Sequence, residues 1–114
     1  MGIVYKIVPA DLWQSAEKTG TFAGAMIDVQ DGYIHFSVGR QAPRTAELYF
    51  AGQPDLLLVA VDDAVLGDAL IYEPSRDGDL FPHLYASLRL ADTLWVRPLP
   101  LGADGRHVFP EDMA

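Results

Sequence analysis

Two segments of this sequence alternate strictly between apolar and polar side chains, which is the pattern of a β-strand with one buried face. The apolar positions are 34, 36 and 38 in the first segment, and 84, 86, 88 and 90 in the second. The polar positions hold Tyr33, His35 and Ser37 in the first segment, and His83, Tyr85, Ser87 and Arg89 in the second. We therefore predict two strands, over residues 33–38 and 83–90, each with a core face and a polar face.

Further strands follow from other patterns. Leu56–Val61 is apolar without alternation, which is typical of a central strand that is covered on both faces. Strands are also expected at residues 4–7, 69–73 and 94–99, and a short final pairing at residues 107–109. The strand at 94–99 should lie at a sheet edge or end there, because Pro98 has no backbone N–H to donate to a neighbour.

Two helices are predicted between these strands. The first begins at residues 9–11 and is closed by Gly20, and the second runs from about residue 42 to 50, with Pro43 in its first turn. One face of the second helix carries Ala42, Ala46, Tyr49 and Phe50, so Tyr49 is expected in the core. Residues 21–29 are predicted to be a loop, and Asp31-Gly32 a turn.

About six strands and two helices without regular βαβ alternation predict an α+β fold. Its sheet should be compact and mixed or largely antiparallel. At 114 residues the chain has the size of one domain, and we expect a single domain over residues 1–114.

Composition limits the function classes. There is no cysteine, which excludes disulfides and thiolate metal sites, and the formal net charge is −8. A chain with this charge and scattered basic residues is not expected to bind nucleic acid. The N-terminus does not have the pattern of a secretion signal, and the longest apolar run is too short to span a bilayer. A cytoplasmic protein without membrane contact is the expectation.

The polar faces of the two alternating strands contain the strongest candidate site. If the strands are neighbours, His35 and Ser37 converge with His83 and Tyr85 on one cleft, and Glu73 at the end of another strand can join them. The same residues are also compatible with an ordinary wet sheet face. A metal site built from His35, His83 and Glu73 is possible, but no metal requirement is predicted, because the spacing of these residues follows no metal-binding motif.

Arg40 and Arg44 flank the start of the second predicted helix. A helix N-terminus carries partial positive charge and free N–H groups, so two arginines there can complete an anion site. Their alternative role is that of solvated surface side chains.

Several sequence blocks resemble a bacterial family known as domain of unknown function 952. The blocks are Tyr5-Lys6-Ile7, then Trp13, then Asp31-Gly32-Tyr33-Ile34-His35-Phe36-Ser37, and finally Phe81-Pro82-His83-Leu84-Tyr85. Their order and spacing match over nearly the whole chain.

That family has been grouped with the ADP-ribosyltransferase-like fold. The resemblance implies that His35 and Ser37 contact a ribose, that Tyr49 or Tyr85 stacks on nicotinamide, and that Glu73 is the catalytic acidic residue. Phe36 stands where that fold has a glycine between His and Ser.

The leading hypothesis is therefore a small domain that binds, or acts on, NAD or an ADP-ribose-type nucleotide, with NAD as a possible substrate and no certain cofactor. His35 and Glu73 would be catalytic. Ser37, Arg40, Arg44, Tyr49, His83 and Tyr85 would bind the ligand. The alternatives are a non-catalytic ligand-binding or protein-interaction domain and, third, metal-assisted hydrolysis.

Overall fold

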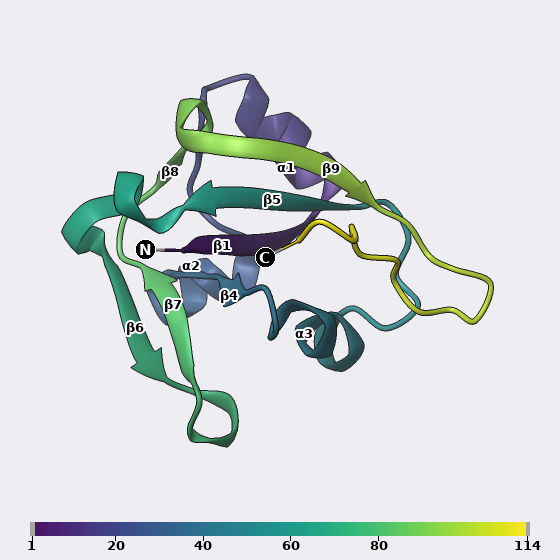
Figure 1. Ribbon diagram of the computed structural model, residues 1–114. Helices are drawn as coiled ribbons and strands as arrows, with labels where there is room; N and C mark the ends of the chain where they lie inside the picture. The colour runs from purple at the N-terminus through teal and green to yellow at the C-terminus, as the bar shows by residue number, and fades with distance from the viewer. Residues whose placement is uncertain (1, 114) are drawn as a thin grey trace.

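The computed structural model describes residues 2–113, so the two ends of the predicted domain, Met1 and Ala114, lie outside the described residues. The α+β class is confirmed (Figure 1). In place of one sheet of about six strands, the described part of the chain contains nine strands in three sheets, and all the pairings are antiparallel.

The largest sheet has the order β4-β1-β5-β9. Its strands are β4 (Ser37–Val38), β1 (Ile3–Pro9), β5 (Leu56–Asp62) and β9 (Thr93–Leu99). The apolar segment at 56–61 is indeed central, because β5 pairs with β1 on one side and with β9 on the other. The prediction that the strand containing Pro98 lies at an edge is also confirmed.

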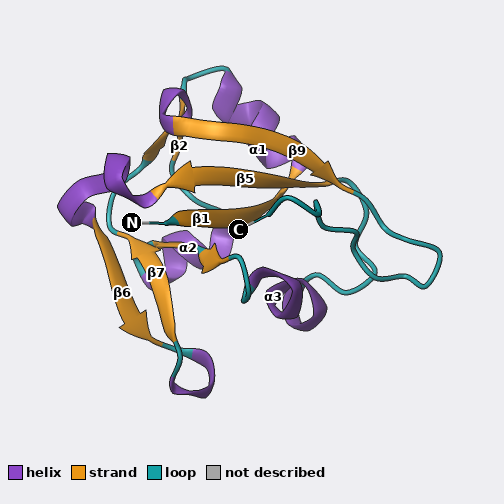
Figure 2. Cartoon of the chain, viewed as in Figure 1, coloured by secondary structure: helices purple, strands orange, loops and turns teal. Residues whose placement is uncertain are grey.

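Both faces of this sheet are covered, which explains the unbroken apolar run of β5. On one face, Val4 and Val8 of β1 pack in a core with Trp13 of helix α1 (Ala10–Glu17). On the other face, Tyr5 and Ile7 pack in a second core with Ala46 of helix α3. Helix α3 spans Ala42–Tyr49. Figure 2 shows α1 behind β5 and β9, and α3 well apart from it, below the strands.

The strands predicted at 33–38 and 83–90 are wrong in their extent, because parts of both belong to two smaller sheets. One sheet has the order β3-β7-β6, and the other pairs β2 with β8. The strands are β3 (Ile34–His35), β7 (Leu80–Leu84), β6 (Leu70–Pro74), β2 (Thr21–Phe22) and β8 (Leu88–Arg89). Each predicted strand is therefore two short strands that belong to different sheets.

The break in the first segment has a visible cause. The backbone N–H of Phe36 donates to the carbonyl of Pro82 in β7, at 2.9 Å, and the next two residues pair with β1 of the main sheet. The chain thus crosses from one sheet to the other at Phe36. In the second segment, the exposed residues 85–87 separate β7 from β8.

The predicted loop at 21–29 is also wrong, because it contains β2 and the start of helix α2 (Met26–Asp31). This helix ends at Gly32, whose φ of 87° is readily adopted only by glycine and whose N–H donates to the carbonyl of Asp28. Short 3₁₀ segments occupy Asp63–Ala69, Arg76–Gly78 and Leu90–Asp92. Of residues 107–109, His107 forms an isolated bridge with Leu101. Over residues 2–113, no helix has both the length and the apolar character that a membrane crossing requires.

Candidate functional site

The two predicted histidines face each other across a strand pair. His35 of β3 is directly opposite His83 of β7, and the centres of their rings are 5.6 Å apart. The prediction that they share one face of a sheet is confirmed, because residues directly opposite in an antiparallel pair point to the same side. Alternation therefore predicted correctly which face both side chains occupy, although both strands are shorter than expected.

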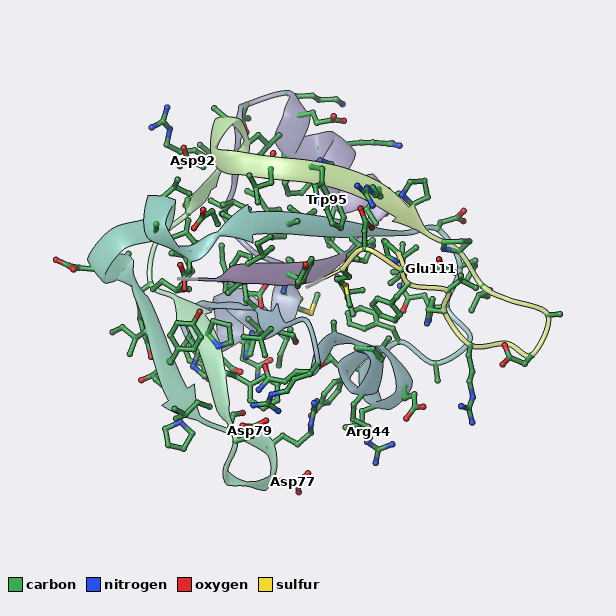
Figure 3. The ribbon with its side chains drawn as sticks, in the orientation of Figure 1. Arg44, Asp77, Asp79, Asp92, Trp95 and Glu111 are labelled. Carbon is green, nitrogen blue, oxygen red and sulfur yellow. The ribbon has the colours of Figure 1, made fainter. Side chains whose placement is uncertain are left out.

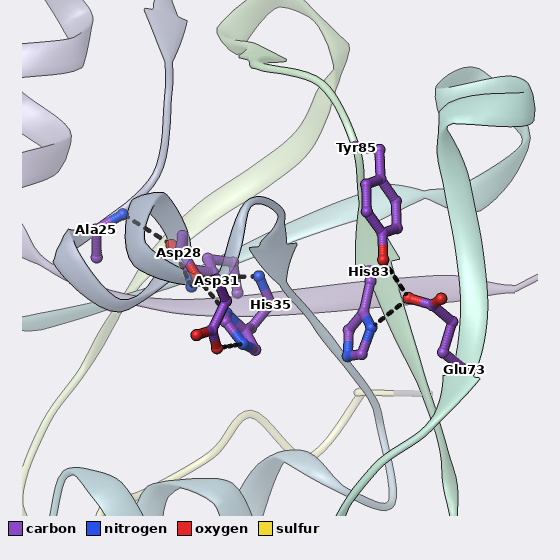
Figure 4. A network of polar contacts seen from close by, with 8 residues as sticks. Ala25, Asp28, Asp31, His35, Glu73, His83 and Tyr85 are labelled. Carbon is purple, nitrogen blue, oxygen red and sulfur yellow. Dashed lines mark hydrogen bonds and ion pairs between the residues drawn. The ribbon is translucent and has the colours of Figure 1, made fainter.

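Glu73 joins this pair from β6, the neighbour of β7 on its other side. Its Oε1 atom lies 2.7 Å from the Nδ1 atom of His83 and 2.7 Å from the hydroxyl of Tyr85, which donates to it (Figure 4). A carboxylate only accepts hydrogen bonds, so the ring proton of His83 lies on Nδ1. These two donors fix the Glu73 carboxylate beside the histidine pair.

Tyr33 completes the arrangement and links its two halves. Its ring stacks on that of His83 with centres 4.1 Å apart, and it lies 4.7 Å from His35 and 5.2 Å from Tyr85. We call these five residues (Tyr33, His35, Glu73, His83 and Tyr85) the two-histidine cluster. Within it, His83 is buried at 4% exposure, whereas the side chains of His35 and Glu73 are about one-third exposed.

A second group of charges lies directly behind His35. Asp28 of α2 accepts from the backbone N–H of His35 at 3.0 Å and contacts its ring Nδ1 at 2.6 Å. It also accepts from the Nζ atom of Lys6 in β1, at 2.9 and 3.1 Å. On the outer side of the ring, Nε2 of His35 lies 3.0 Å from Asp31. Both ring nitrogens of His35 therefore face carboxylates.

The carboxyl groups of Asp28 and Glu73 are held in the ionised form. Burial alone would raise the pKa of Asp28, but the hydrogen bond from His35 and the charge of Lys6 outweigh it and lower that pKa to about 2. The hydrogen bonds from Tyr85 and His83 hold the pKa of Glu73 below its usual range. In return, the bond to Glu73 raises the pKa of Tyr85. The half-exposed rim of the cluster is thus aromatic and negatively charged at neutral pH.

Four of the predicted site residues lie outside this arrangement. The Ser37 hydroxyl is buried and lies 3.1 Å from the hydroxyl of Thr45. Arg40 binds Asp79 through two nitrogens, at 2.8 and 3.0 Å, and Arg44 binds Glu47 at 2.8 Å. Figure 3 shows Arg44 on α3 and Asp79 at the turn between β6 and β7.

Tyr49 is the fourth residue. The prediction that it belongs to the core is wrong, because it is 65% exposed in the last turn of α3. Phe50, one residue further along the chain, packs against the second core instead. Among the contacts described for residues 2–113, none joins Ser37, Arg40, Arg44 or Tyr49 to the two-histidine cluster.

Sequence reasoning missed Lys6, Asp28, Asp31 and Tyr33. One signal was available, since Lys6 is the only charged residue of a strand that is otherwise apolar, and a charge in a buried strand requires a partner. The partner could not be identified, because Asp28 falls in a segment interpreted as a loop. Among residues 2–113, no three metal-ligating side chains are grouped so as to hold an ion.

Two hollows of the surface lie away from the cluster. A hollow of about 400 Å³ lies between α3 and the C-terminal segment, lined by Pro43, Ala46, Glu47, Arg106, His107 and Phe109, among others. A second, of about 250 Å³, lies between α1 and β2. Neither hollow is lined by a residue of the two-histidine cluster, which is the candidate site because of its polar groups.

The sequence and the fold both match known proteins. The family model described as "Protein of unknown function (DUF952)" matches residues 7–96. The X-ray crystal structure of protein CC0527 from Caulobacter crescentus is 42% identical, covers 93% of each chain and superimposes with a TM-score of 0.90. The solution NMR structure of CC0527 gives a TM-score of 0.84, with 93% of this chain and 91% of that chain covered. No curated protein matches the chain.

Proposed function

This chain belongs to the DUF952 family of proteins of unknown function, and we propose that its two-histidine cluster binds the nicotinamide–ribose end of an NAD-type nucleotide. The observation that carries the proposal is the Glu73 carboxylate, fixed by His83 and Tyr85 beside the ring of Tyr33. The nicotinamide ring of NAD is flat and carries a positive charge. Ionised carboxylates and aromatic faces are the groups that attract such a ring.

The exposure of each residue supports a division of roles. His35 and Glu73 are accessible, so they can contact a ligand, with His35 beside the ribose hydroxyls and Glu73 near the anomeric carbon. Tyr85 is half-exposed and can stack on the ring. His83 is covered by Tyr33, and its role is to hold Glu73 rather than to touch the ligand.

The chemistry that fits this arrangement is cleavage of the bond between nicotinamide and ribose. The bonding electron pair leaves with nicotinamide, which becomes neutral, and positive charge develops on the ribose. Glu73 stabilises that charge electrostatically. Water then adds to the anomeric carbon and loses a proton, so the products are nicotinamide, an ADP-ribose-type sugar and H⁺. NAD is the substrate in this scheme, not a resident cofactor.

Phosphate groups contribute less to recognition in this proposal. Arg40 and Arg44, the arginines at the start of α3, already pair with Asp79 and Glu47, and a pyrophosphate would compete with those carboxylates. We therefore expect nicotinamide riboside, which is cationic and carries no phosphate, to bind at least as well as NAD. ADP-ribose, which lacks the nicotinamide ring, should bind more weakly than either.

The test is a titration with nicotinamide riboside, NAD and ADP-ribose, followed by amide shifts in NMR. Shifts should concentrate around residues 33–35, 73 and 83–85. Glu73→Gln should weaken binding of the two cationic ligands roughly fivefold, the order of effect of one partly exposed charge pair. Glu17→Gln on the exposed face of α1 makes the same change of charge and should have no effect.

The outcomes separate the enzyme from the binding domain. Release of nicotinamide from bound NAD, lost in Glu73→Gln, supports the enzyme. Binding without release supports a non-catalytic ligand-binding domain. If all three compounds at millimolar concentration leave these amides unmoved, the nucleotide proposal is wrong, and a protein-interaction role takes its place.

A further inference from the structure

Behind the two-histidine cluster lies a buried ion pair that the proposed chemistry does not use. Lys6 points from β1 to the same side of the main sheet as Val4 and Val8, into the apolar core, and is 6% exposed. Its partner Asp28 is 1% exposed. A buried ion pair is costly to desolvate, and apolar residues of similar volume often stabilise a fold as well or better. Stability alone therefore gives no reason for this pair.

The contacts of Asp28 point to another role. One oxygen, Oδ1, contacts His35 twice, at its backbone N–H and at its ring Nδ1. The other oxygen accepts from the backbone N–H of Ala25 at 2.7 Å and from Lys6 at 2.9 Å. A side chain held by the same oxygen at its backbone and at its ring cannot rotate about χ1 or χ2 without losing a hydrogen bond.

We infer that Asp28 is a positioning residue that fixes the orientation of the His35 ring, with Lys6 as the counter-ion that keeps Asp28 ionised inside the core. The role of His35 as a ligand-contacting residue rests on the proposed function. The orientation of its ring does not, and it can be measured in the free protein. With Nδ1 donating to Asp28, the Nε2 edge of the ring is directed to Asp31 at the surface.

The backbone before α2 packs tightly against the side chain of Asp28. A Cβ atom at Gly24 would lie 2.7 Å from the Cβ of Asp28, so the segment before α2 packs directly on that side chain. Asp28 is therefore confined on three sides, by Gly24, Lys6 and His35. Such confinement is what a group needs if it is to hold a neighbour within a few tenths of an ångström.

Two double variants isolate the contact to His35. Lys6→Met with Asp28→Asn removes both charges but keeps an amide oxygen that can accept from His35. Lys6→Met with Asp28→Leu removes both charges and the acceptor. In both variants the N–H of Ala25 loses its carboxylate, so the pair differs chiefly in the oxygen facing His35. Circular dichroism and thermal melting report whether each variant is folded.

The readouts are the His35 Nδ1–H signal in proton and ¹⁵N NMR, and the affinity for nicotinamide riboside. We expect the Nδ1–H signal in the wild type and in the asparagine variant, and its loss in the leucine variant. Affinity should fall at least fivefold from the asparagine to the leucine variant. An effect on folding alone would change the melting temperature and leave the ratio of affinities unchanged.

Three results would overturn the inference. These are an unchanged Nδ1–H signal in the leucine variant, loss of that signal in the asparagine variant, and a wild-type His35 whose proton lies on Nε2 with Nδ1 bare. The position of the ring proton in wild-type His35 can be measured without any variant. It therefore tests the inference even if the leucine variant does not fold. If the wild type binds none of the three compounds, the proposed function fails, while the ring signal still tests the positioning role.

Discussion

Asp28 links the stability of the protein to pH. Its pKa is about 2 in the folded chain, against 3.8 for an unperturbed aspartate. The unfolded state therefore takes up the proton first as the pH falls, and stability is lost between about pH 4 and about pH 2. The full contribution is present above this window.

We predict that protonation of Asp28 accounts for about 2 kcal/mol of the unfolding free energy that the wild type loses over this window, because its pKa falls from 3.8 to about 2 on folding. The Lys6→Met/Asp28→Leu variant, which has no carboxyl at this position, should lose less over the same range. Urea unfolding at a series of pH values between 5 and 2 measures both curves. Parallel curves would mean that Asp28 is not held ionised by its partners.

Gly24 is a second residue at which the structure makes a sharp prediction. It has a φ of 115°, and an added Cβ would lie 2.7 Å from the Cβ of Asp28. Gly52 has a φ of 71° with nothing within 4 Å of an added Cβ. Gly52→Ala should therefore cost about 1 kcal/mol from backbone strain alone. Gly24→Ala should cost clearly more, because its φ lies well beyond the left-handed helical region and because the added Cβ also displaces Asp28.

Chemical denaturation of the two alanine variants gives the comparison. Equal losses of stability would show that the segment before α2 yields easily, and that Asp28 is less confined than its contacts indicate. NMR of the Gly24→Ala variant should also show a changed His35 ring signal, and the Gly52→Ala variant should not.

At the scale of single residues, what the sequence could predict depended on local pattern. The shared face of His35 and His83 follows from alternation alone, which is a property of two or three neighbouring positions. The pairing of Lys6 with Asp28 spans 22 residues, and nothing near either residue signals the other. Tyr49 shows the reverse case, in which a local pattern misleads: the row that faces the core is Ala42, Ala46 and Phe50, and Tyr49 lies beside this row with its side chain exposed.

At the scale of elements, length and continuity were the weak points. The strands at 33–38 and 83–90 each divide because the chain changes sheets, and the alternation of side chains is the same on both sides of such a crossing. Helix α2 has only six residues and exposes Met26, Ile27 and Val29, so it has no apolar stripe to find. Contacts made by Asp28 and Gly32 hold it, and these depend on the fold around them.

The turn between β6 and β7 is tied to the start of α3 by a clamp that can be tested. Asp79 accepts from two nitrogens of Arg40 and from the side-chain amide of Gln41. These bonds hold the pKa of Asp79 far below its usual range. We predict that Arg40→Ala speeds hydrogen exchange at the amides of Gly78 and Asp79, because the turn loses both bonds from Arg40 and keeps only those from Gln41.

Arg44→Ala is the matched control for this prediction. Arg44 is also an exposed arginine near the start of α3, but it pairs with Glu47 on the same helix. Its loss should leave exchange in the turn unchanged. If both variants behave alike, the clamp does not restrain the turn.

At the scale of the whole molecule, the central position of β5 between two covered faces was predictable, and the number of sheets was not. A run of six apolar residues implies burial on both faces wherever it lies. Which strands pair is decided by contacts between distant segments, such as β1 with β5 and β5 with β9. Local patterns carry no information about these partners.

Net charge supports a prediction for the entire surface. The formal charge is −8, and several of the arginines are already paired with carboxylates. We predict no useful affinity for duplex DNA at physiological salt, because the phosphate backbone repels such a surface. Fluorescence anisotropy with a labelled duplex at low and at physiological salt measures it. Tight binding that survives added salt would contradict the prediction.

The confinement of Asp28 also restricts how this family can diverge. Loss of Asp28 alone leaves the Lys6 ammonium in the core without its carboxylate partner. Loss of Lys6 alone leaves a buried carboxylate that keeps only its hydrogen bonds from His35 and Ala25. Any side chain at position 24 meets Asp28 first. Positions 6 and 28 are therefore expected to change together, whereas Gly24 is kept by its φ of 115° as well as by its contact with Asp28. A lineage that abandons the His35 orientation should replace Lys6 and Asp28 as a pair, while the exposed residues of α3 and the C-terminal segment change independently.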